Sequence, residues 1–245
     1  MSHVFDVWID AGHGGKDPGA SANGLLEKNI VLTVSWGVKQ RLEAEYQGVR
    51  VQLSRSTDVF LELKERTDAA NKAGADLLVS IHCNAGGGAG GLESFRYTNS
   101  SAASRSLQNM LHTEIMAALK PFDVIDRGQK AANLHMCRES KMPAVLTENL
   151  FIDVVADAAK LKRREAIDAL IAGHVTGIAK YLGLKKKGSV AAVSDKVNVV
   201  VNGKQIKDGK LLDGVTYVPL RAVAEALGAT IAWDNKTRTA TVKSK

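Results

Sequence analysis

Hydrophobic residues in the first third of the chain follow two patterns, one typical of buried strands and one typical of helices. Three short, continuous apolar runs predict strands at residues 4–9, 49–53 and 77–81. Between the first two runs, apolar side chains recur at every fourth position and predict a helix with one buried face. These side chains are Ile30, Val34, Val38 and Leu42. A second helix is predicted at 58–72, where Gly74 provides the stop.

The alternation of strand and helix continues as far as residue 182. A glycine-rich loop at 86–91 separates the first part from the next. The further elements are predicted as strands at 92–97, 134–137 and 144–147, a helix at 104–119 and a long helical region at 157–182. Because strands and helices alternate, we expect an α/β fold with a mainly parallel sheet flanked by helices.

The pattern changes after residue 184, at a run of three lysines. We predict a larger domain at residues 1–184, a basic linker at 185–193 and a small α+β domain at 194–245. Alternating valines lead into Asn202-Gly203, which is a strong hairpin signal. A short helix and a last hairpin are predicted in the same domain, at residues 221–227 and 230–242.

Composition excludes two classes of protein. The 245 residues are 45% hydrophobic, and no apolar run approaches the roughly 18 residues that a membrane-spanning helix needs. Stable insertion into a membrane is therefore not expected. Two cysteines, Cys83 and Cys137, do not make a disulfide framework and are expected to be reduced and buried. The first residues lack the basic and apolar regions of a signal peptide, so synthesis in the cytoplasm without one is predicted.

The net charge of +7 is unevenly distributed. Residues 1–184 carry 21 basic and 21 acidic side chains, whereas residues 185–245 carry 12 basic and 5 acidic ones. A basic C-terminal section suggests a polyanionic partner: nucleic acid, an anionic membrane or an anionic wall polymer. Ordinary solvated surface charge is the alternative.

Four polar residues are candidates for chemistry because each lies at a strand end or a helix start. His13 is in the glycine-rich loop that follows the first strand, His82 ends the third strand, Glu148 ends a later strand and Glu27 opens the first helix. The carboxyl ends of parallel strands meet at one edge of a sheet. Two imidazoles and a carboxylate with an open fourth position are typical of a catalytic zinc site. Alternatively, His82 only caps a strand and Glu27 only complements a helix N-terminus.

Several sequence motifs resemble those of a known enzyme family. They are residues 10–19 (DAGHGGKDPG), Glu27-Lys28-Asn29, residues 54–58 (SRSTD), Arg66, Ala70-Asn71, Ala75-Asp76, residues 80–85 (SIHCNA) and residues 142–148 (MPAVLTE). In this order and over residues 4–182, the chain resembles the zinc-dependent N-acetylmuramoyl-L-alanine amidases, which occur as autolysins, cell-division amidases and phage endolysins.

The resemblance implies a fold, a cofactor and a role for each candidate. The fold would be zinc amidase/phosphorylase-like, with Zn²⁺ held by His13, Glu27 and His82 and with Glu148 as the catalytic general base. The substrate would be the amide between the muramic acid lactyl group and L-alanine. Two departures stand out: Ala11 replaces a usual proline, and Asn149-Leu150 follows Glu148 where many relatives have Gly-Phe nearby. We expect the second to reshape the pocket wall.

Other histidines and arginines have less specific interpretations. His112 and His174 fall in predicted helices and are expected at the surface or in the core, while His135 could line the pocket. Arg55 and Arg66 are expected to hold loops or pair with acids rather than to touch substrate.

Residues 194–245 resemble the small domain found at the N-terminus of copper amine oxidases and in many Gram-positive wall proteins. The run at residues 213–221 carries this likeness, yet the segment has no His, Cys or Met, so copper is not implied. Its basic charge favours attachment to the wall. A dimerisation or spacer role is the alternative.

Together these patterns predict a two-domain peptidoglycan amidase whose partner is a wall of the Gram-positive type, with no nucleic-acid partner. The absence of a signal peptide favours a phage endolysin, which acts at the bacterial cell wall, over an autolysin. Two alternatives remain open: a zinc peptidase that cuts stem or cross-bridge peptides, and a non-catalytic wall-binding protein. The oligomeric state is not predicted.

Overall fold

The computed structural model describes residues 3–188, 197–212, 215–235 and 237–244, and the chain divides into two compact units at residues 187 and 188. Each unit is described by itself. The second half of the predicted linker, residues 189–193, lies outside the described residues. Its first three residues lie along the first unit: Gln47 N donates to Lys185 O at 2.9 Å, and Lys187 N donates to Glu45 O at 2.7 Å.

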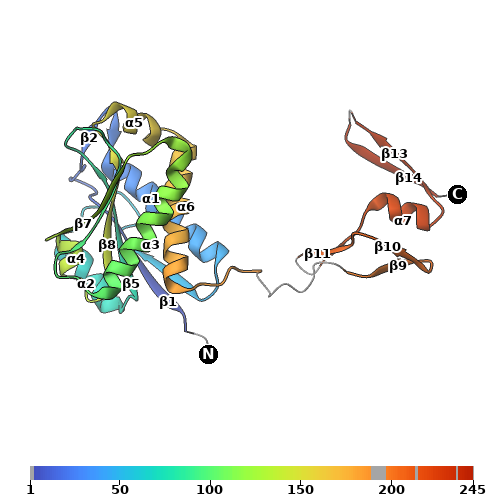
Figure 1. Ribbon diagram of the computed structural model, residues 1–245, viewed down its shortest axis with the longest axis horizontal. Helices are drawn as coiled ribbons and strands as arrows, with labels where there is room; N and C mark the ends of the chain where they lie inside the picture. The colour runs from blue at the N-terminus through green and yellow to red at the C-terminus, as the bar shows by residue number, and fades with distance from the viewer. Residues whose placement is uncertain (1–2, 189–196, 213–214, 236, 245) are drawn as a thin grey trace. The chain divides into compact units, whose positions relative to one another are not determined.

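A six-stranded sheet forms the centre of the first unit (Figure 1). Its strands, in spatial order, are β4 (Val49–Leu53), β1 (Phe5–Ala11), β5 (Leu77–Asn84), β8 (Ala144–Phe151), β6 (Leu92–Tyr97) and β7 (Asp126–Ala132). All neighbours are parallel except β8 and β6, which are antiparallel. The predicted α/β fold with a mainly parallel sheet is confirmed.

Three long helices cover one face of this sheet. They are α1 (Glu27–Glu45), α3 (Ala102–Leu119) and α6 (Arg164–Leu182). The large buried cluster joins their apolar faces to alternate strand residues such as Leu77, Val79 and Ile81. Alternation puts Leu78, Ser80 and His82 on the opposite face of the same strand. Smaller elements complete the unit: β2 (Ser21–Ala22), β3 (Leu25–Leu26), the 3-10 turn η1 (Lys120–Phe122) and α5 (Val155–Leu161).

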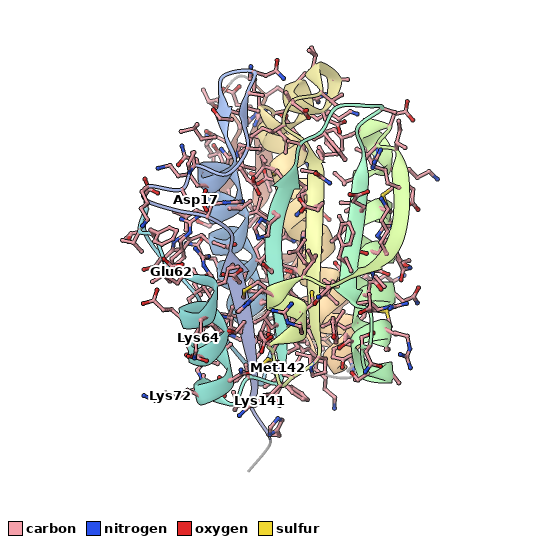
Figure 2. The ribbon with its side chains drawn as sticks, turned by 90° about the vertical axis from the view of Figure 1, so that its left-hand side faces the viewer. Asp17, Glu62, Lys64, Lys72, Lys141 and Met142 are labelled. Atoms are coloured by element: carbon pink, nitrogen blue, oxygen red, sulfur yellow. The ribbon has the colours of Figure 1, made fainter. Side chains whose placement is uncertain are left out.

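Within residues 3–188, the second face carries two short helices, α2 (Leu63–Ala73) and α4 (His135–Arg138). Beneath them lies a small buried cluster that includes Trp8, Leu78 and Met136. Figure 2 shows these helices over the lower half of the sheet, with no helix over the upper half of the strands. The carboxyl ends of β1, β5 and β8 lie in that upper half, so α2 and α4 do not cover the polar side chains there.

The structure corrects several sequence predictions. The strand predicted at 134–137 is wrong: these residues form most of helix α4, and an apolar run this short has no readable period. The 157–182 region consists of two helices rather than one, α5 and α6. Helix α2 begins at Leu63 rather than at residue 58, because Glu62 and Glu65 form a reciprocal capping box.

Two strands differ from prediction in ways that affect the site. Strand β7 was not predicted, because this edge strand is polar and has no buried residue. Strand β8 continues to Phe151, so Glu148 lies inside the strand rather than at its end. Both differences place charged side chains on the open face of the sheet.

The second unit is a small α+β assembly, as predicted. Its elements are β9 (Val199–Val201), β10 (Lys204–Ile206), β11 (Lys210–Leu212), β12 (Val215–Tyr217), α7 (Leu220–Ala226), β13 (Thr230–Asp234) and β14 (Thr239–Lys243), and the strands pair as three antiparallel hairpins. Asn202 and Gly203 both have positive φ, at 49° and 75°, as the predicted two-residue turn requires. The β11–β12 hairpin was not predicted. Across the described residues of both units, every helix falls short of the length and apolar character that crossing a bilayer demands.

Candidate metal centre and active site

Three potential ligands converge at the carboxyl edge of the sheet. His13 lies in the loop after β1, Glu27 is the first residue of α1, and His82 lies near the end of β5. Glu27 Oε1 is 3.1 Å from His13 Nε2 and 3.0 Å from His82 Nδ1. One ligand atom from each residue lies within 4.8 Å of the other two. The structure therefore brings together His13, Glu27 and His82, which the strand order predicted from sequence had placed at one edge of the sheet.

Two glycines allow this close approach. A Cβ at Gly12 would lie 2.3 Å from His82 Cε1, and a Cβ at Gly19 would lie 2.6 Å from both Glu27 Oε2 and His13 Cδ2. Gly19 also has a φ of 64°, in the left-handed region that glycine adopts without strain. His13 itself has a φ of 60°, an uncommon value that turns the loop at the imidazole.

Hydrogen bonds fix the orientation of the potential ligands. His13 Nδ1 donates to Asp17 Oδ2 at 2.8 Å, which leaves Nε2 directed at Glu27. The Glu27 carboxylate accepts from two main-chain groups, Ala20 N at 2.8 Å and Cys83 N at 3.0 Å. The Asp17 contact is an outer-shell partner of the kind that sets the tautomer of a ligating histidine.

Two buried arginines hold the loop from beneath, as predicted. Arg66 donates to Asp10 Oδ1 at 2.9 Å and to the carbonyls of Ala11 and His13 at 2.7 and 2.6 Å. Arg55 donates to main-chain carbonyls within the loop and at the start of α1. Both guanidinium groups are thereby committed to the protein rather than to a ligand.

The electrostatics of the cluster favour a bound cation. Burial opposes charge on His13, but hydrogen bonds and charges from Glu27 and Asp17 raise its pKa to about 9. The pKa of His82 is raised against burial by Glu27 and Glu148. Burial also opposes charge on Glu27, yet the two imidazoles hold its pKa well below the usual range. The acidic neighbours thus stabilise positive charge at the two imidazoles.

Glu148 lies next to His82 on the adjoining strand, in direct register. Its Oε2 is buried and has no hydrogen-bond partner among the residues that the structure describes. Burial is the main cause that raises the pKa of this carboxyl group to about 7. A carboxyl group with a pKa near neutrality, next to a potential metal site, suits general acid–base catalysis.

The strand is irregular directly after Glu148. Leu150 is fully buried with a φ of 71°, and the register with β5 shifts between His82 and Asn84. A positive φ is a genuine outlier for a bulky residue, and such strain gathers at functional sites. The irregularity lets Asn149 Nδ2 donate to His82 O at 2.9 Å.

The family comparison agrees with this geometry. Residues 7–180 match the model of the N-acetylmuramoyl-L-alanine amidase family. The chain belongs to this family. Residues 183–245 of the amidase match the model of the copper amine oxidase N-terminal domain.

Two curated relatives of the amidase come from different sources. It is 47% identical to a sporulation-specific N-acetylmuramoyl-L-alanine amidase of Bacillus subtilis over 76% of this chain and 71% of that protein. It is 50% identical to an endolysin of Bacillus phage SPP1 over 78% of this chain and 71% of that protein. Among solved structures, an N-acetylmuramoyl-L-alanine amidase from Clostridium difficile 630 aligns with a TM-score of 0.71 and 33% identity, covering 74% of this chain and 98% of that one.

A cavity of about 320 Å³ adjoins the histidines of the amidase. It is lined by His13, His82 and the loop that leads into α2, and Figure 2 labels two of its lining residues, Asp17 and Glu62. His135 does not line this cavity, contrary to the possibility raised from sequence; its Nε2 lies 3.3 Å from Thr67 Oγ1 on α2.

Two further histidines of the amidase are buried, which decides between the surface and core positions left open from sequence. His112 contacts Ser94 and Asp126. His174 Nδ1 donates to Leu170 O at 2.8 Å, and its Nε2 accepts from the Thr147 hydroxyl at 3.0 Å. Cys83 and Cys137 are free and buried, as predicted.

Two features of the site were not identified from sequence. The orienting role of Asp17 could have been suspected from its place four residues after His13 in the same loop. Glu93, which faces Glu148 across β6 and β8, had no local signal, because only the strand order brings the two together.

Proposed function

We propose that this chain is a zinc-dependent peptidoglycan hydrolase that cleaves the amide between N-acetylmuramic acid and L-alanine. The single observation that carries the proposal is the convergence of His13, Glu27 and His82 next to Glu148, whose buried Oε2 has no hydrogen-bond partner in the described part of the chain. Membership of the amidase family supports the reaction, and the residues support the metal.

The donor set fits zinc. Two imidazole nitrogens and a carboxylate oxygen are zinc ligands, and a catalytic site uses three of them with one position left open. Ligand atoms around a tetrahedral zinc ion lie about 3.3 Å apart. The separations of 3.1 and 3.0 Å at Glu27 Oε1 are close to that spacing. His13, Glu27 and His82 would therefore hold the ion through Nε2, Oε1 and Nδ1.

Residues of the chain would carry out the proton transfer and hold the site in position. Zinc, when bound, lowers the pKa of water to about 7 and polarises a carbonyl group. Glu148 would accept the proton of the attacking water at its free Oε2 and return it to the leaving amine of L-alanine. Asn149, which holds the His82 carbonyl, would keep the two neighbouring strands in place during the reaction.

Product analysis on purified peptidoglycan tests the reaction. New L-alanine amino termini are expected, with no new sugar reducing ends. New diamino-acid or D-alanine amino termini would instead identify a zinc peptidase. If the zinc-loaded protein forms no product, the alternative of a non-catalytic wall-binding protein would be favoured.

We further propose that the basic second unit attaches the enzyme to an anionic wall. Its support is the charge distribution, because residues 188–245 carry 9 basic and 5 acidic side chains, whereas residues 1–184 carry 21 of each. Curated relatives include both a bacterial amidase and a phage endolysin, so either biological setting suits the same chemistry.

A further inference from the structure

A second buried glutamate lies next to Glu148 on the open face of the sheet. Glu93 of β6 pairs in register with Glu148 of β8, so both side chains leave the same face. Glu93 Oε1 accepts from Asn84 Nδ2 at 2.6 Å. Because Asn84 belongs to β5 and Glu93 to β6, this hydrogen bond crosses over β8 beyond Glu148.

The other oxygen of Glu93 is shared by two cations from β7. Arg127 Nε donates to Glu93 Oε2 at 2.9 Å, and Lys130 Nζ donates to the same atom. Burial opposes the charge of Glu93, but these hydrogen bonds and charges from Lys130 and Arg127 hold its pKa below the usual value. One carboxylate therefore neutralises only one of two positive charges, and the group keeps a net charge of about +1.

Both cations are accessible. The Arg127 side chain is 31% exposed and the Lys130 side chain 40%, whereas that of Glu93 is 5% exposed. Arg127 is also held by the Gly90 carbonyl at 3.4 Å and lies over the Phe151 ring at 4.5 Å. Lys130 has no hydrogen-bond acceptor other than Glu93 within the described ranges, which leaves donors free for an external anion.

The next acidic group on β7 is directed away from these cations. Asp126 Oδ1 accepts from His112 of α3 at 2.8 Å and from Gly128 N at 2.7 Å, which turns this side chain toward the helix-covered face. The spare positive charge is therefore directed to the open face, on the side of Glu148 away from His82.

We propose that Lys130, supported by Arg127, is an anion subsite that binds a free carboxylate on the peptide side of the scissile amide. This inference rests on the proposed function. Glu148 must return its proton to the leaving amine, so the peptide has to leave the centre on the Glu148 side. The strand order β5, β8, β6, β7 places Lys130 and Arg127 farther along that direction. An ammonium group and a guanidinium group both form strong, charge-assisted hydrogen bonds to carboxylate.

The test compares two muropeptides that differ in a single group. Both carry L-alanine followed by a glutamate linked through its side chain; one has a free α-carboxylate and the other an α-carboxamide. The zinc-loaded full-length protein is expected to show a kcat/KM about tenfold higher for the carboxylate, the scale of one charge-assisted hydrogen bond. For Lys130→Gln this ratio should fall to about one, mainly through a higher KM for the carboxylate substrate.

Lys130 is the better position to change because Arg127 still pairs with Glu93 when Lys130 is replaced, so no buried carboxylate is orphaned. Lys130→Arg should restore the preference. Lys180→Gln is the matched control, because it breaks the ion pair between Lys180 and Glu114, which lies outside the site, and should leave the ratio unchanged.

Two results would overturn the subsite. Equal kcat/KM values of the unaltered enzyme for the two muropeptides would refute it while leaving the amidase assignment intact. An equal loss on both substrates in Lys130→Gln would mean that Lys130 only supports Glu93. Failure of the proposed function looks different, because then neither muropeptide nor purified wall would yield L-alanine amino termini.

Discussion

His13 Nδ1 lies 2.8 Å from Asp17 Oδ2, across a turn of the loop that follows β1. The carboxylate can only accept, so Nδ1 carries a proton, and Nε2 is the ring nitrogen that faces Glu27. This single contact determines which nitrogen is available to a metal ion. The other oxygen of Asp17, Oδ1, accepts from Gly19 N at 3.0 Å and so connects two positions within the same glycine-rich loop.

Asp17→Asn is therefore expected to weaken zinc binding by roughly 10- to 100-fold, the usual cost of losing an outer-shell partner. Competition against a chelator of known affinity measures the change. Asp58→Asn is the matched control, because Asp58 binds Gly15 N and Lys28 near the same loop without touching a ligand. Equal zinc affinity of the Asp17 variant and the control would contradict the assigned role.

His82→Ala should abolish zinc binding and hydrolysis together, since it removes one of three donors. Atomic absorption on the purified protein gives the metal content. His135→Ala serves as the control, because this histidine contacts α2 and does not line the cavity. A His82→Ala protein with one zinc per chain would show that the metal is held elsewhere.

Glu148→Gln should behave differently from the ligand variants. It keeps the shape of the side chain and removes the proton acceptor, so zinc should remain while turnover falls by roughly 10²–10⁴-fold. Single-turnover hydrolysis of a soluble muropeptide, with metal content determined in parallel, separates the two effects. Loss of zinc in this variant would make Glu148 a ligand instead of a base.

The buried His174 predicts a pH dependence of stability. Burial lowers its pKa to about 4, against an ordinary value of 6.5. Between these two pH values the imidazole is protonated in the unfolded chain and neutral in the folded chain. The contribution of His174 to the free energy of unfolding is therefore present in full above pH 6.5 and is lost as the pH falls toward 4. The full contribution is about 3 kcal/mol.

Denaturant unfolding of the zinc-loaded protein between pH 7 and 4.5 tests this, with His174→Gln compared with the unaltered chain. The variant should lose less stability over that interval, whereas His3→Gln, at an exposed position, should follow the unaltered chain. Parallel curves for His174→Gln and the unaltered protein would show that another group dominates.

A chain that ends at Lys187 tests the role of the second unit. The cut keeps the lysines that pair with the end of α1, so the catalytic unit stays whole. Cleavage of soluble muropeptides should persist, while binding to purified walls should drop. Binding of the full-length protein should weaken with salt, because exposed charges are screened beyond about 10 Å at 0.1 M. Equal pelleting of both proteins with walls would favour a spacer or dimerisation role.

The sequence alone determined most of the first unit and its candidate ligands. Apolar residues at every fourth position predicted α1, because a helix buries one face. The strands at 49–53 and 92–97 have the predicted bounds, because a short apolar or alternating run between turn residues is typical of a β-strand. His13, Glu27 and His82 could be grouped because parallel strands bring their carboxyl ends to one edge.

Only the tertiary structure decided what surrounds those ligands. Strand order is not sequence order: β8 inserts between β5 and β6, and this alone sets Glu148 between His82 and Glu93. At Leu150, burial in the core and the neighbouring Asn149–His82 hydrogen bond outweigh local backbone preference. Strand β7, with Arg127 and Lys130, has no apolar period because an edge strand on an open face buries no side chain of its own, and it acquires its place only by pairing with β6.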